Sequence, residues 1–222
     1  MVMSVRSLPD SIEQVSIVAV GLFDIDEFQP SNLRSLGSIE LDELENGQVT
    51  FRVPDTFMIQ YSRLGIQAEK NKVSLISTLE EPVFERVREF FLSFFGSSKK
   101  HSVTAMGINY DLHRRVADVA RWHAIGHRLV PKDAWQSDLK LQNAGLLSVT
   151  VEGKREDGEA GGVRVRSEPS TLLTPGVFVQ VNDHFDLKPD GGLDDALRIV
   201  NTHWQNCRRR HIDISSAITA LR

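Results

Sequence analysis

The chain has 222 residues, of which 41 % are apolar and 25 % are charged, and its formal net charge is -4 at pH 7. This composition is close to that of an average folded protein, which argues against wholesale disorder, and its weakly acidic balance gives no overall attraction to nucleic acid or to an anionic membrane. The single cysteine, Cys207, excludes a disulfide within the chain and fits a reducing compartment. We therefore expect a cytoplasmic protein that has no membrane partner, and the overall charge does not indicate nucleic acid, although a local basic patch stays open.

The first third of the chain is dominated by strand patterns. Residues 14–23 are rich in valine and isoleucine and predict a buried strand, which is far shorter than the roughly 20 apolar residues that span a bilayer. The acidic connecting stretch that follows has room for a short helix. Residues 48–62 predict a strand in which Pro54 marks an edge position or a break, and residues 63–78 predict two short strands around a turn at 69–72.

Residues 80–98 carry the strongest helix pattern. Pro82 occupies a first-turn position, where the missing N–H costs nothing, and Gly96 lies where a helix often ends in a left-handed residue. A charged face formed by glutamates and arginines lies opposite a broad apolar face, which predicts a core helix rather than an aromatic ligand site. The apolar face consists of Val83, Val87, Phe90, Phe91, Phe94 and Phe95. We predict that Phe84, Phe91, Phe94 and Trp204 are largely buried.

The second half of the chain repeats the style of the first. In chain order the patterns predict a strand at 101–112, a helix at 114–136 that Gly126 and Pro131 interrupt, a hairpin at 145–168, a strand at 176–187, a helix at 189–210 and a separate short helix in the tail. In the helix at 189–210, acidic residues begin the helix and Arg208, Arg209 and Arg210 end it, as the helix dipole favours.

Runs of strands followed by a helix predict an α+β fold with a mostly antiparallel sheet in two strand-then-helix halves. We divide the chain into an N-terminal half at 1–112, a helical connector at 113–140 and a C-terminal half at 141–222. The two halves are alike in pattern only, because no residue-by-residue repeat relates them.

The histidines of the stretch RWHAIGHRLVP are the first candidate site. His123 and His127 are four residues apart, so on a helix they lie on one face and can share a metal, as in the H-E-x-x-H motif of zinc proteases. The glutamate that activates water in that motif is replaced here by Ala124, and Gly126 weakens the helix by roughly 1 kcal/mol relative to alanine. We predict that the two histidines bind no metal.

The alternative is a metal site in which further side chains complete the histidine pair. Its third ligand would be Asp133, with His113 and Asp118 as other donors. Under this alternative the protein would be a metal-assisted hydrolase or a metal-binding protein.

The stretch VNDHFDLKPDGG is the second candidate site. It gathers Asn182, Asp183, His184, Asp186 and Asp190, which have the chemistry to hold a divalent ion or to transfer protons. The spacing does not match a calcium-binding loop, and a strand end that runs into a turn explains the same residues. We favour that structural explanation.

Basic residues and the cysteine form the third group of candidates. The segment 207–211 has three arginines that could grip a phosphate, although they also complement the helix dipole. Cys207 occupies an apolar helical position and is predicted to be a small core residue, while its neighbours His203 and His211 leave a Cys–His pair open geometrically. Arg164 and Arg166 share one face of a strand, which we expect to be solvated. No glycine-rich nucleotide motif is present, and we predict no cofactor.

Three stretches together resemble a sporadically distributed, uncharacterised family of bacterial proteins. The stretch VTAMGINYDLHRRV contains Gly107, Ile108, Asn109 and Tyr110 after the helix that opens with Pro82 and Phe84, and SIVAVGLF and IVNTHWQNC are similar to other parts of that family. The chain departs from the family in the RWHAIGH region and in the basic end of its last helix. The resemblance implies a bacterial cytoplasmic protein and assigns no activity and no catalytic residue.

The sequence as a whole therefore favours a non-catalytic protein that acts through self-association or through binding to another macromolecule. Exposed sheet edges in both halves favour pairing with a partner strand, and a homodimer is the simplest assembly. A protein partner is the expected macromolecule.

Overall fold

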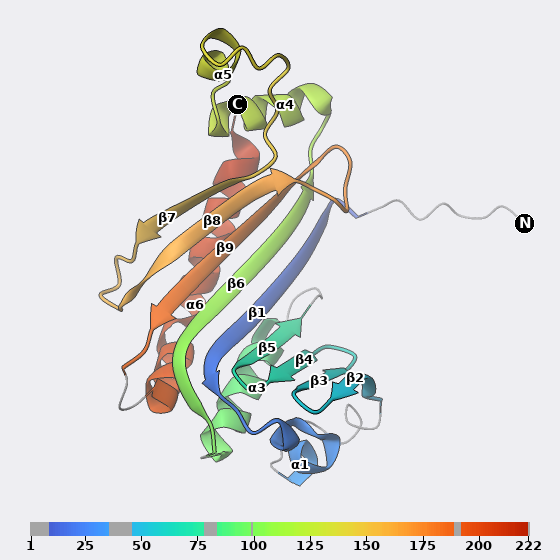
Figure 1. The fold of residues 1–222 in the computed structure, drawn as a ribbon, viewed down its shortest axis with the longest axis vertical. Helices are drawn as coiled ribbons and strands as arrows, with labels where there is room; N and C mark the ends of the chain where they lie inside the picture. Colours follow the sequence, from blue (N-terminus) through green and yellow to red (C-terminus); the bar gives the residue numbers. More distant parts are fainter. Residues whose placement is uncertain (1–8, 36–45, 78–83, 99, 189–191, 222) are drawn as a thin grey trace, which may run out of the picture.

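The computed structural model describes residues 9–35, 46–77, 84–98, 100–188 and 192–221. Within these residues the fold is α+β, and nine strands form one antiparallel sheet in the order β2-β3-β4-β5-β1-β6-β9-β8-β7 (Figure 1). The strands are β1 (Ser11–Leu22), β2 (Gln48–Val53), β3 (Thr56–Gln60), β4 (Gly65–Glu69), β5 (Lys72–Ser77), β6 (Ser102–Arg115), β7 (Val149–Lys154), β8 (Gly161–Pro169) and β9 (Gly176–Asp186). The helices are η1 (Ile25–Phe28), α1 (Pro30–Ser35), α3 (Phe84–Ser97), α4 (Val119–Leu129), α5 (Asp133–Ser137) and α6 (Gly192–Ala220).

The two halves of the described chain follow the same plan, with five strands in the first half and four in the second. In each half the first strand, β1 or β6, pairs with the last strand, β5 or β9, and the preceding hairpin strands continue the sheet outward. The helix that follows, α3 or α6, packs on those same two strands. The first strands of the halves, β1 and β6, pair with each other at the centre, so one continuous sheet crosses the predicted boundary at residue 112, which lies inside β6. The predicted helical connector begins inside β6, which runs to Arg115, so the helix predicted from residue 114 is wrong at its start. The connector then contains α4, in which Gly126 makes no break, and α5, which follows Pro131.

One face of the sheet is covered and the other is open. Figure 1 looks onto the open face, with the strands in front of α3 and α6. The alternation of side chains along each strand explains the difference, because Val15, Ile17 and Ala19 of β1 point toward the helices and are buried, whereas Val20 is largely exposed. Antiparallel sheets tolerate such one-sided cover when the outer face is polar.

The strand predictions are confirmed, and the structure adds where the strands break and turn. The strand predicted at 48–62 is a hairpin, because Pro54 and Asp55 form the turn between β2 and β3. The predicted turn at 69–72 joins β4 to β5. The connecting stretch after β1 contains η1 and α1, and Asp24 caps η1 by accepting a hydrogen bond from the backbone N–H of Asp26.

The predicted core helix is α3, and its phenylalanines are buried. Phe90 and Phe94 stack with ring centroids 5.5 Å apart, and Phe94 also packs against Phe28 of η1. The prediction that Gly96 ends the helix is wrong: the backbone N–H of Ser98 still donates to the carbonyl of Phe94 at 3.1 Å, so the helix runs on to Ser97. Pro82 and Val83 lie outside the described residues.

The last helix is longer than predicted. α6 continues without a break from Gly192 to Ala220, so the separate tail helix and the helix end at Arg210 are both wrong. The reason is a stripe of buried positions that extends past the arginines, through His211 and Ser215, while Ile214 and Ile218 pack into a second apolar cluster. The three arginines therefore lie inside the helix, where the dipole no longer accounts for them.

Two apolar clusters fill the covered side. The larger one joins α3, α6 and the central strands and contains Trp204, whose indole N–H donates to Glu85 at 3.0 Å. The smaller one lies where α4 crosses the end of the sheet and contains Ile125, Val177 and Val179. In the part of the chain that the structure describes, no helix is both long enough and apolar enough to cross a membrane.

The Phe91 side chain tests the assignment of the core. Phe91 is fully buried on α3, so Phe91→Ala should lower the free energy of unfolding by about 3–5 kcal/mol, through lost burial and the cavity left behind. Chemical denaturation measures this change. The control is Leu172→Ala, whose side chain is 55 % exposed and which should cost less than about 0.5 kcal/mol. A loss below about 1 kcal/mol for Phe91→Ala would show that α3 presents another face to the core.

Candidate functional site

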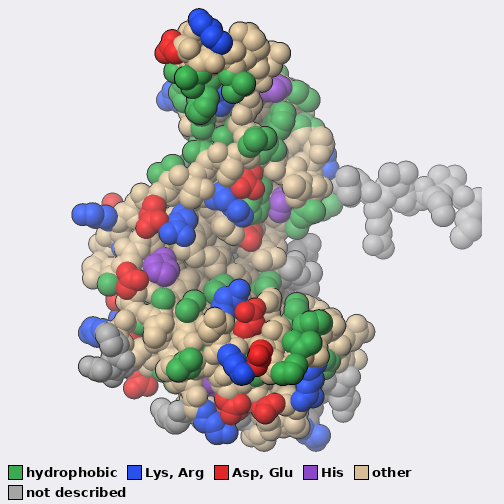
Figure 2. Space-filling model, viewed as in Figure 1, with side chains coloured by type: hydrophobic (Ala, Val, Ile, Leu, Met, Phe, Trp, Pro, Cys, Tyr) green, Lys and Arg blue, Asp and Glu red, His purple; other side chains and the backbone are tan. Residues whose placement is uncertain are grey.

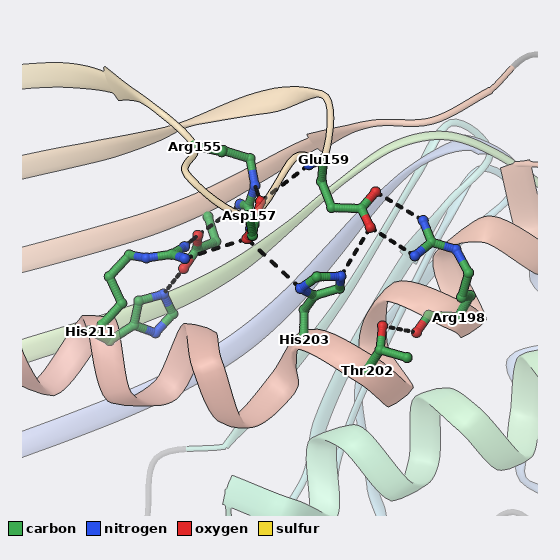
Figure 3. A network of polar contacts seen from close by, with 9 residues as sticks. Arg155, Asp157, Glu159, Arg198, Thr202, His203 and His211 are labelled. Carbon is green, nitrogen blue, oxygen red and sulfur yellow. Dashed lines mark hydrogen bonds and ion pairs between the residues drawn. The ribbon is translucent and has the colours of Figure 1, made fainter.

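A buried ionic network joins β9 to α6 and takes in several of the residues that the sequence singled out (Figure 3). At its centre Asp183 of β9 is completely buried. One of its carboxylate oxygens accepts hydrogen bonds from Arg155, at 2.7 Å, and from Arg210 of α6. Its other oxygen lies 2.8 Å from Nε2 of His211, one residue further along α6. The network therefore fixes the middle of α6 to the sheet.

The alternation of β9 explains why this carboxylate is inside. Val179, Val181 and Phe185 are buried on the helix side of the strand, and Asp183 occupies a position in the same row. A lone carboxylate there would cost several kcal/mol, because burial removes its water and nothing replaces it. Here two guanidinium groups and an imidazole surround it, so the charge is paired.

The loop between β7 and β8 supplies the other half of the network. Its Arg155 side chain is only 1 % exposed, lies 3.7 Å above the Phe185 ring and donates from Nε to Asp157 at 3.0 Å. Further along the loop, Glu159 accepts two hydrogen bonds from Arg198 of α6, at 2.8 and 2.9 Å, and lies 3.0 Å from Nε2 of His203. The loop thus closes over α6 as a clamp, which we call the 155–159 clamp.

The 155–159 clamp is the part of the network that sequence reasoning missed. The stretch REDGEAGG was assigned to a hairpin tip, and it does join β7 to β8. Its charged residues pair with residues of α6 roughly 40 positions later in the chain, which no local pattern reveals. The available signal was the spacing of His203 and Arg210, which lie about two turns apart and therefore on one side of the helix.

The charges of the network shift the pKa values of its carboxyls. Burial acts to raise the pKa of Asp183, but the hydrogen bond and charge of His211, with the charges of Arg210 and Arg155, outweigh it and hold the pKa below the ordinary value. Asp157 follows the same balance: burial opposes the hydrogen bond and charge of Arg155, and its pKa falls to about 2. Both groups are therefore carboxylates at neutral pH.

Cys207 lies on α6 beside this network and is fully buried. Burial, and then the nearby Asp183 carboxylate, raise the pKa of the thiol to about 12. A nucleophilic cysteine needs a lowered pKa, since the thiolate is the reactive form. The arrangement therefore fits the prediction that Cys207 is a small core residue, and His203 and His211 direct ring nitrogens toward carboxylates.

The stretch VNDHFDLKPDGG does not form one site, because its residues alternate between the two faces of β9. Asp183 points into the network, whereas Asn182 and His184 line a shallow trough on the open face. In that trough Nδ2 of Asn182 donates to Asn109 of β6, and His184 lies 3.2 Å from Asp186. Asp190 lies outside the described residues.

The open face otherwise presents paired charges. Figure 2 shows basic and acidic side chains interspersed over the strands on this side. Arg164 donates to Glu152 at 2.8 Å in an exposed pair, and Arg166 lies 3.5 Å from Glu168 in a half-buried pair. Arg164 and Arg166 therefore occupy a solvated face, as the sequence predicts, and the pairing leaves little net charge there.

The histidine pair lies on α4, away from the network. His123 and His127 are exposed, with ring centroids 6.3 Å apart, and they line a small hollow beside the sheet. The other residues proposed as ligands have different places: Asp118 caps α4, Asp133 begins α5, and His113 of β6 lies 2.9 Å from the Ser170 hydroxyl.

The positions of these residues do not support metal binding. Among the described residues, no group of three or more histidine, cysteine, aspartate or glutamate side chains is arranged to hold a metal ion. The prediction that the histidine pair binds no metal stays a prediction.

No family model matches this chain, and a search of curated proteins finds no match. The resemblance to the uncharacterised bacterial family therefore stays a prediction as well.

The central carboxylate gives the first test of the network. Asp183→Asn keeps the size of the side chain but leaves Arg155, Arg210 and His211 around a neutral group. We expect the free energy of unfolding to fall by about 3–5 kcal/mol, because like charges then remain buried without their partner. Chemical denaturation at pH 7 measures the change.

The control for Asp183→Asn is Glu152→Gln, which breaks the pair with Arg164, where each side chain is 56 % exposed. That change should cost less than about 1 kcal/mol, since water screens exposed pairs. Equal losses in the two variants would contradict a stabilising role for the network.

Acid titration gives the second test. The folded-state pKa of Asp157 is about 2, below its ordinary value, so the folded chain binds fewer protons than the unfolded chain as the pH falls. The stabilising contribution of Asp157 is complete above about pH 4 and is lost as the pH falls toward about 2. In urea denaturation at stepped pH, the wild type should lose about 1–2 kcal/mol more over this window than Asp157→Asn does. Identical acid slopes would contradict the pairing.

Proposed function

We propose that this protein is a non-catalytic bacterial protein of the cytoplasm that acts by association, and that its first partner is a second copy of itself, bound through strand β2. Further binding to another protein would follow from the dimer. The proposal rests chiefly on one observation, the exposure and composition of β2.

β2 is an edge strand with little protection. All six of its residues are exposed, and Val49, Phe51 and Val53 are each between 43 % and 50 % exposed. Valine, threonine and phenylalanine favour extended strands, and in the described chain the outer side of β2 has no strand beside it. Unpaired N–H and C=O groups on such an edge form a template for another strand.

The opposite edge strand, β7, is better protected against pairing than β2, which favours β2 as the strand that binds a second copy. β7 carries Glu152, Lys154 and the helix- and strand-weakening Gly153, and Glu152 is already paired with Arg164. Charges and glycine discourage the addition of a strand. β2 has one charge, Arg52, against the two charges and the glycine of β7. The irregularity in its pairing with β3 between Val49 and Phe51 gives β2 some protection as well, so the comparison rests on charge and on apolar side chains. The apolar side chains of β2 contribute to the hydrophobic surface at that end of the molecule in Figure 2.

A second copy suits this edge because a two-fold axis brings identical strands together in antiparallel orientation. Each copy then offers the same residues, and the two sheets join through backbone hydrogen bonds. Contact between the two Phe51 side chains, or between Phe51 and Val53, would remove apolar surface from water on both copies.

The chemistry of the polar residues supports association over catalysis. Asp183 is sealed inside the fold, the Cys207 thiol has a pKa of about 12, and the Glu159–His203 pair is engaged with Arg198. These groups stabilise α6, and none of them is an activated nucleophile beside a free base. The cytoplasmic location rests on the lone cysteine and on the family resemblance.

Sedimentation equilibrium at tens of micromolar tests the proposal. The wild-type protein should sediment at about twice the 24.9 kDa mass of one chain. Phe51→Lys places a charge on the edge and should shift the protein to the single-chain mass, because the charge would lose its water on pairing.

The matched control is Val151→Lys, which adds the same charge to β7, where Val151 is 62 % exposed. It should leave the mass unchanged. A wild-type protein that stays at the single-chain mass, or a dimer that Phe51→Lys leaves intact, would refute association through β2.

A further inference from the structure

A small hollow lies between α4 and the end of the sheet. Its apolar walls come from Trp122 and Ile125 of α4, from Leu146 in the segment before β7, and from Val177 of β9. These residues belong to three separate parts of the chain. α4, which forms one wall of the hollow, lies at the end of the molecule away from β2 (Figure 1).

Gly126 lines the hollow and is the feature that needs an explanation. It lies inside α4, where glycine destabilises a helix relative to alanine. Close packing does not require it, because a Cβ atom at this position would meet only the Cβ of Leu146, at the ordinary contact distance of 3.6 Å. Its backbone is helical, so a positive φ does not require it either. An alanine would therefore fit here, whereas a larger side chain would extend into the hollow.

The polar groups around the hollow are mainly basic. His123 and His127 lie on its rim, and neither has a hydrogen-bond partner among the described residues. Lys132 also lines it and is 7 % exposed. The Lys132 ammonium donates to the carbonyls of Gly126 and Val130 and, within the described residues, forms no ion pair with a carboxylate.

A buried ammonium without a carboxylate partner favours an anionic ligand. An ammonium has three donors, of which the two carbonyls use two. Burial lowers the pKa of Lys132, and among the described residues no carboxylate opposes this effect. The one acidic side chain lining the hollow, Glu168, already accepts from Ser148 at 2.9 Å and lies near Arg166, so it is engaged elsewhere.

We propose that this hollow binds a small amphipathic monocarboxylate, with its apolar tail against Ile125 and Leu146 and its carboxylate between Lys132 and the histidine pair. The inference is independent of association through β2, because no residue of β2 takes part. It gives the His123–His127 pair a role as anion donors.

Isothermal titration calorimetry on the full chain tests the proposal with octanoate as the probe and octanol as its uncharged counterpart. Octanoate should bind saturably with one site per chain, and octanol should bind at least about tenfold more weakly, since it lacks the charge that the ammonium and imidazoles recognise. Absence of octanoate binding, or equal affinity for octanol, would overturn the proposal.

Two substitutions at Gly126 distinguish an effect on ligand binding in the hollow from an effect on the stability of α4. Gly126→Ala adds one carbon that has room, so it should raise the melting temperature and retain binding. Gly126→Leu should fill the hollow and abolish octanoate binding while the protein still melts cooperatively. Undiminished binding by Gly126→Leu would show that the ligand lies elsewhere.

The histidine pair is tested by the His123→Gln, His127→Gln double variant, which changes only exposed side chains and should weaken octanoate binding severalfold. The matched control is His184→Gln, an exposed histidine on the open face, which should bind octanoate as the wild type does. Equal affinity in the double variant and the wild type would contradict the assigned role of the pair. This set of results does not depend on the oligomeric state.

Discussion

The antiparallel pairing of β1 with β6 is the interaction on which the rest of the architecture depends. It runs the length of β1, from Ser11 opposite Arg114 to Leu22 opposite Ser102, and it joins the first strands of the two halves. Each half then extends the sheet away from this seam, so the sheet grows outward in both directions and ends in two edges, β2 and β7. Because the sheet stays open, it must protect those edges or use them. Our proposal of association follows from the weaker protection of β2.

The β1–β6 pairing also determines where the two main helices lie, and different interactions hold each helix on the sheet. α3 is held by phenylalanines, such as Phe90 and Phe94, that pack against the first half of the sheet and η1. α6 is held by apolar contacts through Trp204 and also by the buried Asp183 network and the 155–159 clamp. The helices meet each other where Glu85 accepts hydrogen bonds from Trp204 and Gln205. Ionic contacts need particular geometry, so they fix the position of α6 more narrowly than apolar packing alone would.

The α+β fold class and most of the strands could be predicted from the sequence, because side-chain alternation and turn residues are visible within a few neighbouring positions. The burial of Phe91 and Trp204 also followed from helical spacing. What could not be predicted depends on contacts distant in sequence. In the sequence Asp183 belongs to a cluster of polar residues, yet its sequence neighbours point to the opposite face of β9. Its partners are Arg155, from the loop before β8, and Arg210, from α6. The length of α6 was missed because the arginine run resembles a helix end, whereas tertiary packing of Ile214 and Ile218 carries the helix on. Gly126 looked like a helix breaker, and its relation to Leu146 appears only in three dimensions.

Hydrogen–deuterium exchange of the β2 amides as a function of protein concentration tests the central claim, that this edge pairs with a second copy, most directly. If β2 strands pair across a two-fold axis, outward amides of residues 48–53 should exchange more slowly as the concentration rises from about 1 to about 100 μM, because mass action populates the dimer. Amides of residues 149–154 in β7 serve as the internal reference and should exchange at rates that do not depend on concentration. Exchange in β2 that is equally independent of concentration would contradict association through this edge.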